Sequence, residues 1–295
     1  MKTSFITTVF NEENTVTKFL NSLLTQTKLP DEVTIVDGGS TDKTVALIEK
    51  KVTEYTKKKN VPPIKWKIII KKGNRSIGRN EAIKKSTGTI IVCSDAGNLL
   101  AKNWFEEITK PFTTKGTDVV AGYYKGKTKT IFQKCLIPFA LVMPDQIDER
   151  NFLPATRSIA FTKKIWKKVG GFDENLSHNE DYAFAHKLRD AGTKIVFTRS
   201  AIVYWIPRTS FKEAFVMFYR FALGDAEAGL FRSKVLLLFF RYCLGIYLVL
   251  LSILYKSSWG MVVLGFLFIC YLLWSIKKIY RYIESKKSFF FLPAF

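Results

Sequence analysis

Residues 7–44 read TTVFNEENTVTKFLNSLLTQTKLPDEVTIVDGGSTDKT, and this stretch decides the fold. It continues an apolar, β-branched run over 4–10 that predicts a first strand. Its apolar residues between 16 and 24 recur every three or four positions, which is typical of a helix. A second strand is expected over 32–36. A strand, a helix and a second strand in this order indicate a parallel βαβ unit.

The alternation of helices and strands continues to about residue 95. The pattern predicts a helix from 41 or 42 to about 58, a strand over 64–70, a helix over 76–86 and a strand over 89–93. We therefore expect an α/β fold with a mainly parallel, Rossmann-like sheet and helices on both faces. Ligands of such sheets bind at the carboxyl ends of the strands, so Asn11, Asp37 and Asp95 should meet at one edge.

The middle of the chain is less regular, and it is followed by two apolar segments. We expect a helix over 179–191, strands over 194–198 and 201–205, and an amphipathic helix over 210–223. Residues 235–255 carry one charge, Arg241, and residues 259–276 carry none. A membrane-spanning helix needs about 20 mainly apolar residues. The sequence thus predicts one domain over 1–230 and a membrane-anchoring region over 231–295.

Positive charge flanks the two apolar segments on their outer sides. The flanking residues are Arg232, Lys234, Lys277, Lys278 and Arg281. Such flanks favour a cytoplasmic position for both ends, which predicts a two-helix membrane hairpin. A pair of buried or interfacial helices is the alternative interpretation.

The composition favours anionic partners. The chain has 295 residues and a formal net charge of +21, which suits phosphate groups or acidic lipid head groups. Charge alone also fits a nucleic-acid binder, but no zinc-finger spacing occurs and the apolar segments fit lipid better. The four cysteines form no CxxC pair, as expected for reduced thiols. The N-terminus is interpreted as a strand, so no cleaved signal peptide is expected.

Residues 36–44, VDGGSTDKT, place Asp37 at the end of a strand and before two glycines. Glycines allow a tight turn or the close approach of a ligand to the backbone. An ordinary strand–turn–helix connection would have a similar composition. The local sequence leaves both interpretations open.

Three motifs in this order resemble a known family. Besides residues 7–44, they are GNRSIGRNEAIKKSTGTIIVCSDAGN at 73–98 and GGFDENLSHNEDYAFAHKLRDAG at 170–192. Over roughly residues 3–230 the chain resembles the inverting GT-A glycosyltransferases of family 2. The resemblance implies a GT-A fold and the transfer of a sugar from a nucleotide-diphosphate sugar.

The resemblance assigns nucleotide-binding residues to the first two motifs. The base and ribose pocket would be lined by Thr8, Phe10, Asn11 and Glu12. Asp37 would accept a hydrogen bond from the base, and a carboxylate suits the imide N–H of uracil or thymine. Arg75 and Arg79 would lie near the diphosphate, although a solvated helix face also explains these two arginines.

The resemblance also implies a divalent cation, Mg²⁺ or Mn²⁺. Family members carry an Asp-x-Asp metal motif after the corresponding strand, whereas this chain has Asp95-Ala96-Gly97-Asn98. Asp95, with Asn98 as a second oxygen ligand, would bind the cation together with diphosphate oxygens and water. Because Gly97 stands where the second aspartate is usual, the site lacks one carboxylate ligand, which changes the affinity for the cation and the geometry of its coordination.

The third motif contains the acidic pair Glu180-Asp181, which matches a Glu-Asp pair of the family. Asp181 would be the general base that accepts the proton of the acceptor hydroxyl, with Glu180 as its catalytic neighbour. Acidic residues also favour helix N-termini for purely structural reasons, which is the alternative interpretation. His178 is expected to be structural.

Residues before the apolar segments complete the predicted site. The diphosphate or the acceptor would be contacted by Trp205, Arg208 and Arg220. The full interpretation is an integral protein of the cell membrane with a cytoplasmic catalytic domain and a lipid-linked or glycan acceptor.

Two alternative functions compete with this interpretation. A sugar-phosphate nucleotidyltransferase would carry a glycine-rich loop where Asn11-Glu12-Glu13 stands. A catalytically inactive, membrane-bound nucleotide-sugar-binding or scaffold subunit would explain the incomplete metal motif.

Overall fold

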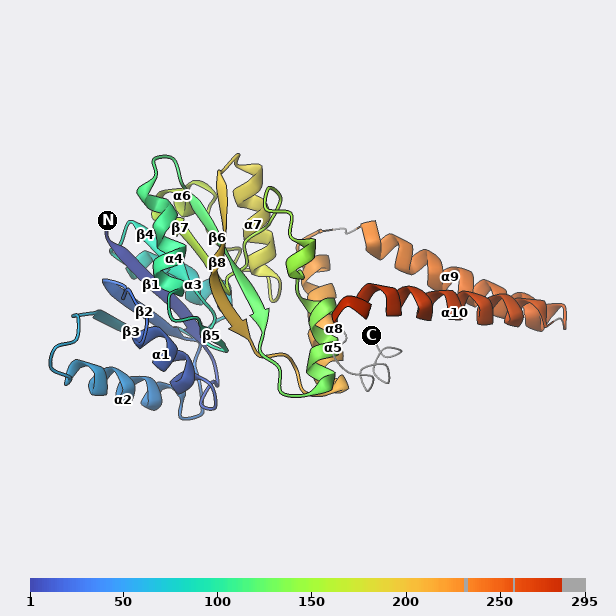
Figure 1. Ribbon diagram of the computed structural model, residues 1–295, viewed down its shortest axis with the longest axis horizontal. Coiled ribbons are helices and arrows are strands. Elements are labelled where there is room, and N and C mark those ends of the chain that lie inside the picture. Colours follow the sequence, from blue (N-terminus) through green and yellow to red (C-terminus); the bar gives the residue numbers. More distant parts are fainter. Residues whose placement is uncertain (231–232, 257, 283–295) are drawn as a thin grey trace. The chain divides into compact units, whose positions relative to one another are not determined.

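The computed structural model describes residues 1–230, 233–256 and 258–282, and the strands in this part of the chain form one eight-stranded sheet (Figure 1). Arg232, one of the cations that flank the predicted hairpin, lies outside the described residues. The strands are β1 (Thr3–Val9), β2 (Glu32–Asp37), β3 (Lys65–Ile70), β4 (Ile90–Cys93), β5 (Asn98–Leu100), β6 (Val119–Gly126), β7 (Ile159–Thr162) and β8 (Ile195–Trp205).

The α-helices connect these strands or follow them. They are α1 (Val16–Leu24), α2 (Thr44–Thr56), α3 (Arg75–Lys85), α4 (Trp104–Thr109), α5 (Ile131–Ala140), α6 (Lys163–Lys168), α7 (Glu180–Asp190), α8 (Phe211–Glu227), α9 (Ser233–Leu254) and α10 (Trp259–Ile279). Short 3₁₀ turns cover Lys110–Thr113, Pro144–Gln146 and Tyr280–Tyr282.

The first half of the sheet is parallel, as the sequence predicts. The strand order is β3-β2-β1-β4-β7-β6-β8-β5, and β1 pairs in parallel with both β2 and β4. The second half is mixed, because β7 runs antiparallel to β4 and β6, and β5 runs antiparallel to β8. The carboxyl ends of β1, β2 and β4 therefore lie at one edge of the sheet.

Helices cover both faces of the sheet, which confirms the layered architecture. Side chains alternate between faces along β1, so Phe5 packs with α1, α2 and α4 while Ile6 packs with α3, α6 and α7. Both side chains are fully buried. The helix α3 and the helix α7 thus share one core beneath the edge that carries the predicted site.

The sequence interpretation was wrong for strand β8, which was expected as two strands, 194–198 and 201–205. The structure has one strand, and its pairing with β6 shifts from Gly122 opposite Thr198 to Tyr123 opposite Ile202. Three residues of β8 are accommodated in this irregularity. The polar pair Arg199-Ser200 interrupts the apolar pattern there, so the bulge looks like a break in the sequence.

The chain divides into two compact units. The first comprises Met1–Lys127 and Pro144–Ile206, and the second comprises Thr128–Met143 and the chain from Pro207 onward. The segments that carry α5 and α8, which the sequence placed in the domain 1–230, group with the second unit.

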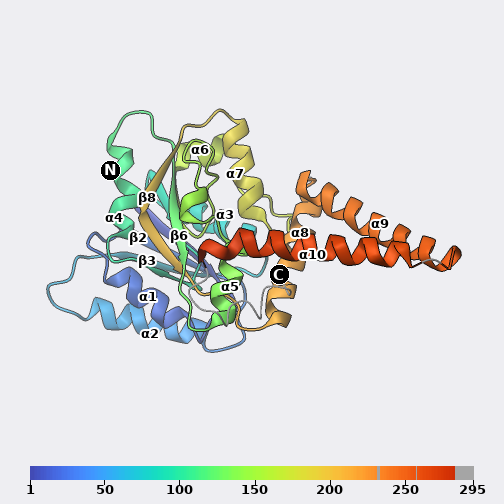
Figure 2. The ribbon, with the colours of Figure 1, turned by 45° about the vertical axis from the view of Figure 1, so that its right-hand side comes forward.

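Within the second unit, α9 and α10 run side by side (Figures 1 and 2). Residues Val235–Leu254 and Trp259–Lys277 are long and apolar enough to cross a membrane, judged by length and composition alone. The guanidinium carbon of Arg241 lies 4.6 Å from the centroid of the Tyr271 ring, so the charge within α9 is directed at α10. A cation–π contact of this kind suits a charge on an apolar helix.

Candidate active site

The loops that follow β1 and β2 are joined by hydrogen bonds. The Asn11 backbone N–H donates to Ser40 Oγ at 2.9 Å, and the Asn11 side-chain oxygen accepts from the Thr41 N–H at 2.9 Å. The Glu12 N–H donates to Thr44 Oγ1 at 2.7 Å. These bonds bring the predicted nucleotide-binding residues Asn11 and Glu12 to the carboxyl end of β2.

Asp37 organises the turn that follows β2. One of its oxygens accepts from the Gly39 and Ser40 N–H groups, each at 2.9 Å, and the other accepts from Ser40 Oγ at 2.5 Å. The residue is 1% exposed. Asp37 is thus buried at the carboxyl end of β2, where the nucleotide is predicted to bind. Its direct contact with a base stays a prediction.

The other predicted residues of the nucleotide edge differ in exposure. Phe10, which directly follows β1, is 59% exposed, and its contact with a nucleotide stays a prediction. Thr8 faces α3, where a Cβ added to Gly78 would lie 2.7 Å from Thr8 Cγ2. Glycine at 78 therefore lets α3 approach β1, which positions the residue that follows it, Arg79.

Arg79 connects the predicted metal residue to the acidic pair. Its Nη1 donates to Glu180 Oε1 at 2.5 Å, and its Nη2 donates to Asp95 Oδ1 at 2.9 Å and to Thr156 Oγ1 at 3.0 Å. Arg79 is 2% exposed, and its guanidinium carbon lies 5.5 Å from the centroid of the Phe172 ring. The sequence assigned Arg79 to the diphosphate, whereas the structure buries it between two carboxylates.

Arginine cations hold Asp95 in its charged form. Burial acts to raise the pKa of Asp95, but the opposing charges of Arg79, Arg75 and Arg157 lower it below the usual value for aspartate. Thr156 Oγ1 also donates a hydrogen bond to Asp95 Oδ1 at 3.2 Å. Even with these partners, the Asp95 side chain is 37% exposed. A charged, partly exposed carboxylate at the end of a strand can bind a ligand.

The residues fit a divalent cation only in part. Asp95 supplies a hard, charged oxygen of the kind that Mg²⁺ and Mn²⁺ prefer. Asn98, the first residue of β5, is 3% exposed, and its role as a second ligand stays a prediction. Among residues 1–230, 233–256 and 258–282, no three His, Cys, Asp or Glu side chains are grouped as metal ligands. A cation here would therefore take most of its ligands from substrate and water.

The surroundings of Asp181 raise its pKa. Burial and the neighbouring charge of Glu180 raise the pKa of Asp181, while the cations Arg157 and Arg79 lower it, and the net shift is upward. A higher pKa makes the ionised carboxylate a better proton acceptor. Glu180 and Asp181 form the first turn of α7, so the helix N-terminus also stabilises their negative charge.

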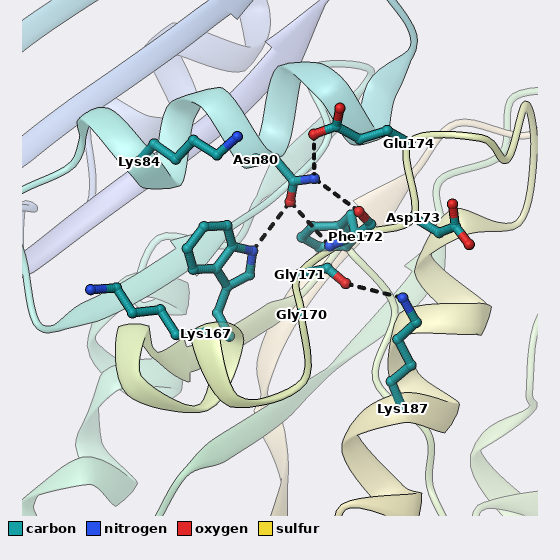
Figure 3. A pocket seen from close by; sticks show the side chains of 10 residues that line it. Asn80, Lys84, Lys167, Gly170, Gly171, Phe172, Asp173, Glu174 and Lys187 are labelled. Carbon is teal, nitrogen blue, oxygen red and sulfur yellow. Dashed lines mark hydrogen bonds between the residues drawn. The ribbon is translucent and has the colours of Figure 1, made fainter.

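Asn80, which matches the family's second motif but received no role from the sequence, positions the Gly-Gly-Phe motif before α7. Its side-chain oxygen accepts from the Phe172 N–H at 3.0 Å, and its side-chain nitrogen donates to the Phe172 carbonyl at 2.8 Å (Figure 3). Gly171 has φ of 72°, and a Cβ there would lie 2.9 Å from the same Asn80 oxygen. Glycine is therefore required, because a side chain would break this clamp.

A cavity of about 570 Å³ lies beside this clamp (Figure 3). Lys84, Lys167 and Lys187 line it together with Asp173 and Glu174. The side chain of Glu174 accepts a hydrogen bond from Asn80 at 2.8 Å, so part of this lining holds the loop in place.

Sequence analysis also missed Arg157, which precedes β7. Its guanidinium carbon lies 5.5 Å from the centroid of Tyr124 and 5.3 Å from that of Trp205. The structure thus brings the predicted residue Trp205 into contact with Arg157. The positive charge of Arg157 acts to lower the pKa of both Asp95 and Asp181. Arg208 and Arg220, the remaining predicted contacts, belong to the second unit.

Residues 4–159 match the family model described as glycosyl transferase family 2. This match covers more than half of the chain, and the chain belongs to that family.

Two relatives have similar sequences. The glycosyltransferase AglE of Haloferax volcanii is 26% identical over 208 residues, which cover 68% of this chain and 65% of the relative. The succinoglycan biosynthesis protein ExoA of Rhizobium meliloti is 24% identical over 213 residues, covering 68% of this chain and 62% of the relative. The chain therefore spans less than two thirds of the length of each.

Solved structures of two other proteins confirm the GT-A fold. TarS of Staphylococcus aureus, residues 1–349 with UDP-GlcNAc, aligns with a TM-score of 0.56 at 21% identity, covering 71% of this chain and 60% of that one. The mannosyltransferase PcManGT of Pyrobaculum calidifontis, with GDP-Man and Mn²⁺, aligns with a TM-score of 0.58 at 16% identity, covering 77% and 62%.

Proposed function

We propose that this protein is an inverting glycosyltransferase that transfers a sugar from a nucleotide-diphosphate sugar to a hydroxyl of a lipid-linked or polysaccharide acceptor. The observation that carries this proposal is the bridge from Asp95 through Arg79 to Glu180, because it links the carboxyl end of β4 to the first turn of α7, where Asp181 lies. Membership of family 2 supports the reaction class. The nucleotide sugars bound in the TarS and PcManGT structures support the type of donor.

In the proposed reaction, Asp181 accepts the proton of the acceptor hydroxyl as that oxygen attacks the anomeric carbon. The new glycosidic bond forms on the face of the anomeric carbon opposite the diphosphate. The bond between that carbon and the diphosphate oxygen breaks, and the nucleoside diphosphate leaves with the electron pair. The configuration of the anomeric carbon is therefore inverted. A divalent cation, when bound, would neutralise charge on the diphosphate. Asp95 is the residue that would hold it, and Arg75 supplies further positive charge near Asp95.

Asp95→Asn should reduce both turnover and its dependence on Mn²⁺. The amide is a weaker ligand for a hard cation and removes the charge that pairs with Arg79. Initial rates of sugar transfer across a Mn²⁺ titration measure both effects. Asp173→Asn, on the cavity side of the Asn80 clamp, is the control. Full activity of the wild-type protein in excess chelator would remove the metal from the proposal.

The proposed setting is the cytoplasmic face of the cell membrane. Under this proposal residues 1–230 carry the catalysis and residues 231–295 anchor the chain. The support is the pair of candidate spans in α9 and α10, together with the net charge of +21, which favours anionic lipid surfaces.

Alkaline carbonate should leave the full-length protein in the membrane pellet. Two spanning helices bury their apolar residues in hydrocarbon, and raising the pH does not weaken that interaction. Immunoblots of pellet and supernatant after carbonate extraction measure the outcome. Release into the supernatant would favour helices that lie in the interface.

One experiment tests the enzymatic proposal against an inactive binding subunit, which the glycine at 97 favours. Purified full-length protein is screened against nucleotide sugars by thermal shift, with and without Mn²⁺, and each binder is then tested for transfer to membrane extracts. Binding with release of nucleoside diphosphate and an extended acceptor supports a glycosyltransferase. Binding without either product, under all conditions, supports the inactive subunit.

A further inference from the structure

Arg241 is the one charged residue between Val235 and Leu254, the first of the two candidate spans. It stands six residues after Val235, which corresponds to about 9 Å at the rise of an α-helix. An arginine at the centre of a membrane is costly, but at this depth its long side chain can turn back toward the head groups. Side chains of a helix tilt toward its N-terminus, and α9 begins at the predicted cytoplasmic end. In the proposed membrane setting, the guanidinium of Arg241 therefore reaches the level of the lipid head groups.

Two aromatic rings orient this guanidinium. Its carbon lies 4.6 Å from the centroid of Tyr271 on α10 and 5.3 Å from that of Tyr242 on α9. Tyr271 is in turn stacked on Trp274, with ring centroids 6.0 Å apart. Tyrosine and tryptophan are enriched at membrane–water interfaces, which fits the depth of Arg241. Arg241 and Tyr242 are both exposed, so a molecule that lies against the two helices can contact the guanidinium directly.

Arg241 has no anionic partner within the described part of the chain. Over residues 1–230, 233–256 and 258–282, its guanidinium forms no ion pair and donates no hydrogen bond. The sequence of the two helices offers no acid either, because Glu284 is the one acidic residue after position 230 and it follows α10. A charged group beside hydrocarbon is unfavourable unless it is paired. The anion that pairs with Arg241 therefore has to come from outside α9 and α10.

We propose that Arg241, oriented by Tyr271, binds the phosphate of a phospholipid in the cytoplasmic leaflet. The planar guanidinium offers parallel N–H donors that match phosphate oxygens in a bidentate arrangement. Anionic lipids of that leaflet are attracted by cations next to a span, and Lys234 and Lys277 stand at the same end of the two segments. This inference goes beyond glycosyl transfer, and it rests on the proposed membrane setting of α9 and α10.

The affinity for the first bound lipid tests this proposal. It is measured by native mass spectrometry on the delipidated, detergent-solubilised full-length protein. The probes are dioleoyl phosphatidylglycerol, dioleoylglycerol, which has the same acyl chains but no phosphate, and a polyprenyl monophosphate as the other source of a lipid phosphate. The variants are Arg241→Gln, Arg241→Lys and Tyr271→Leu. Lys256→Asn, in the connection between α9 and α10, is the control for the loss of one positive charge, and asparagine tolerates the left-handed backbone there.

Arg241→Gln should weaken the binding of phosphatidylglycerol by about 10-fold or more, because hydrogen bonds to a charged group are lost, and should leave dioleoylglycerol unchanged. Arg241→Lys should weaken it by about threefold, since lysine keeps the charge but lacks the parallel donors. Tyr271→Leu should also cost about threefold through the lost cation–π contact. Lys256→Asn should stay within about twofold, because position 256 lies about 22 Å along the helix, beyond a Debye length.

The proposal is overturned if phosphatidylglycerol binds no more tightly than dioleoylglycerol, or if Arg241→Gln and Lys256→Asn weaken its binding equally. An effect of Arg241→Gln on polyprenyl monophosphate alone also overturns it, because the site would then belong to a lipid-linked acceptor. So does a lower Tm of Arg241→Gln with unchanged lipid affinity, since Arg241 would then only join α9 to α10. Should Arg241→Gln not fold, Arg241→Lys decides, and wild-type affinity in that variant contradicts the bidentate contact.

Two parallel measurements separate this proposal from the proposed function. Release of the protein by alkaline carbonate would overturn the membrane setting and the phospholipid site together. Sugar transfer is assayed on the same preparations. A chain that transfers no sugar, but whose phosphatidylglycerol binding depends on Arg241, would contradict the glycosyltransferase and support the phospholipid site.

Discussion

Asp181→Asn should lower kcat by about 10²–10⁴-fold while donor affinity changes little. The amide keeps the size of the side chain but does not accept the acceptor proton. Burial and Glu180 raise the pKa of Asp181, so wild-type turnover should also fall as the pH drops through that raised pKa and the carboxylate becomes protonated. Transfer rates against pH and UDP titrations on the same preparations measure these effects.

Two matched variants separate catalysis from structure. Asp190→Asn, at the exposed end of α7, should keep near-normal turnover. Glu180→Gln should be milder in kcat than Asp181→Asn if Glu180 only orients the site through Arg79. Near-normal turnover of Asp181→Asn would transfer the role of base to Glu180. Loss of UDP binding in Asp181→Asn would indicate a structural role instead.

Arg79→Met should destabilise the first unit by about 3–5 kcal/mol, because removing one partner of a buried ion pair leaves a buried charge without compensation. Glu180 is 4% exposed and would lose its cation, and Asp95 would lose the same partner. Urea unfolding of the solubilised protein, followed by tryptophan fluorescence, measures the change in free energy of unfolding.

The control is Arg189→Met on α7, whose partner Asp190 is exposed. Exposed pairs contribute about 0–1 kcal/mol. The double variant Arg79→Met/Glu180→Gln should recover part of the loss, since the orphaned charge is then removed. Equal losses for Arg79→Met and Arg189→Met would show that the bridge does not stabilise the fold.

The parallel half of the fold was predictable because its elements are local. The helix over 16–24 has regular apolar spacing, and strands and helices alternate without interruption as far as β4. The mixed half was not, because the insertion of β7 between β4 and β6 depends on pairings between distant residues. The bulge in β8 similarly depends on its partner β6.

The sequence motifs located most of the candidate site but not its internal connections. Asp95 and Glu180 stand 85 positions apart, and nothing local in the sequence shows that Arg79 joins them. Arg157 lies in an irregular stretch with no periodic pattern around it. The only local signal was a single arginine between two hydroxyl residues, Thr156 and Ser158, just before a strand.

The hydrogen bonds that Arg79 and Asn80 of α3 make to the segment before α7 have a consequence for building chimaeras between relatives. Asn80 holds Phe172 and its neighbour Arg79 holds Glu180, so the loop over 173–179 is fixed at both ends by adjacent residues of one helix. The length of such a loop affects closure entropy only slowly. A loop grafted between these anchors would also have to keep the hydrogen bonds from the Asn74 side chain to the Glu174 and Leu176 carbonyls. A crossover point between α3 and residues 172–180 would remove the hydrogen bonds of both Asn80 and Arg79 to this segment. In a chimaera, α3 and residues 172–180 therefore have to come from the same parent.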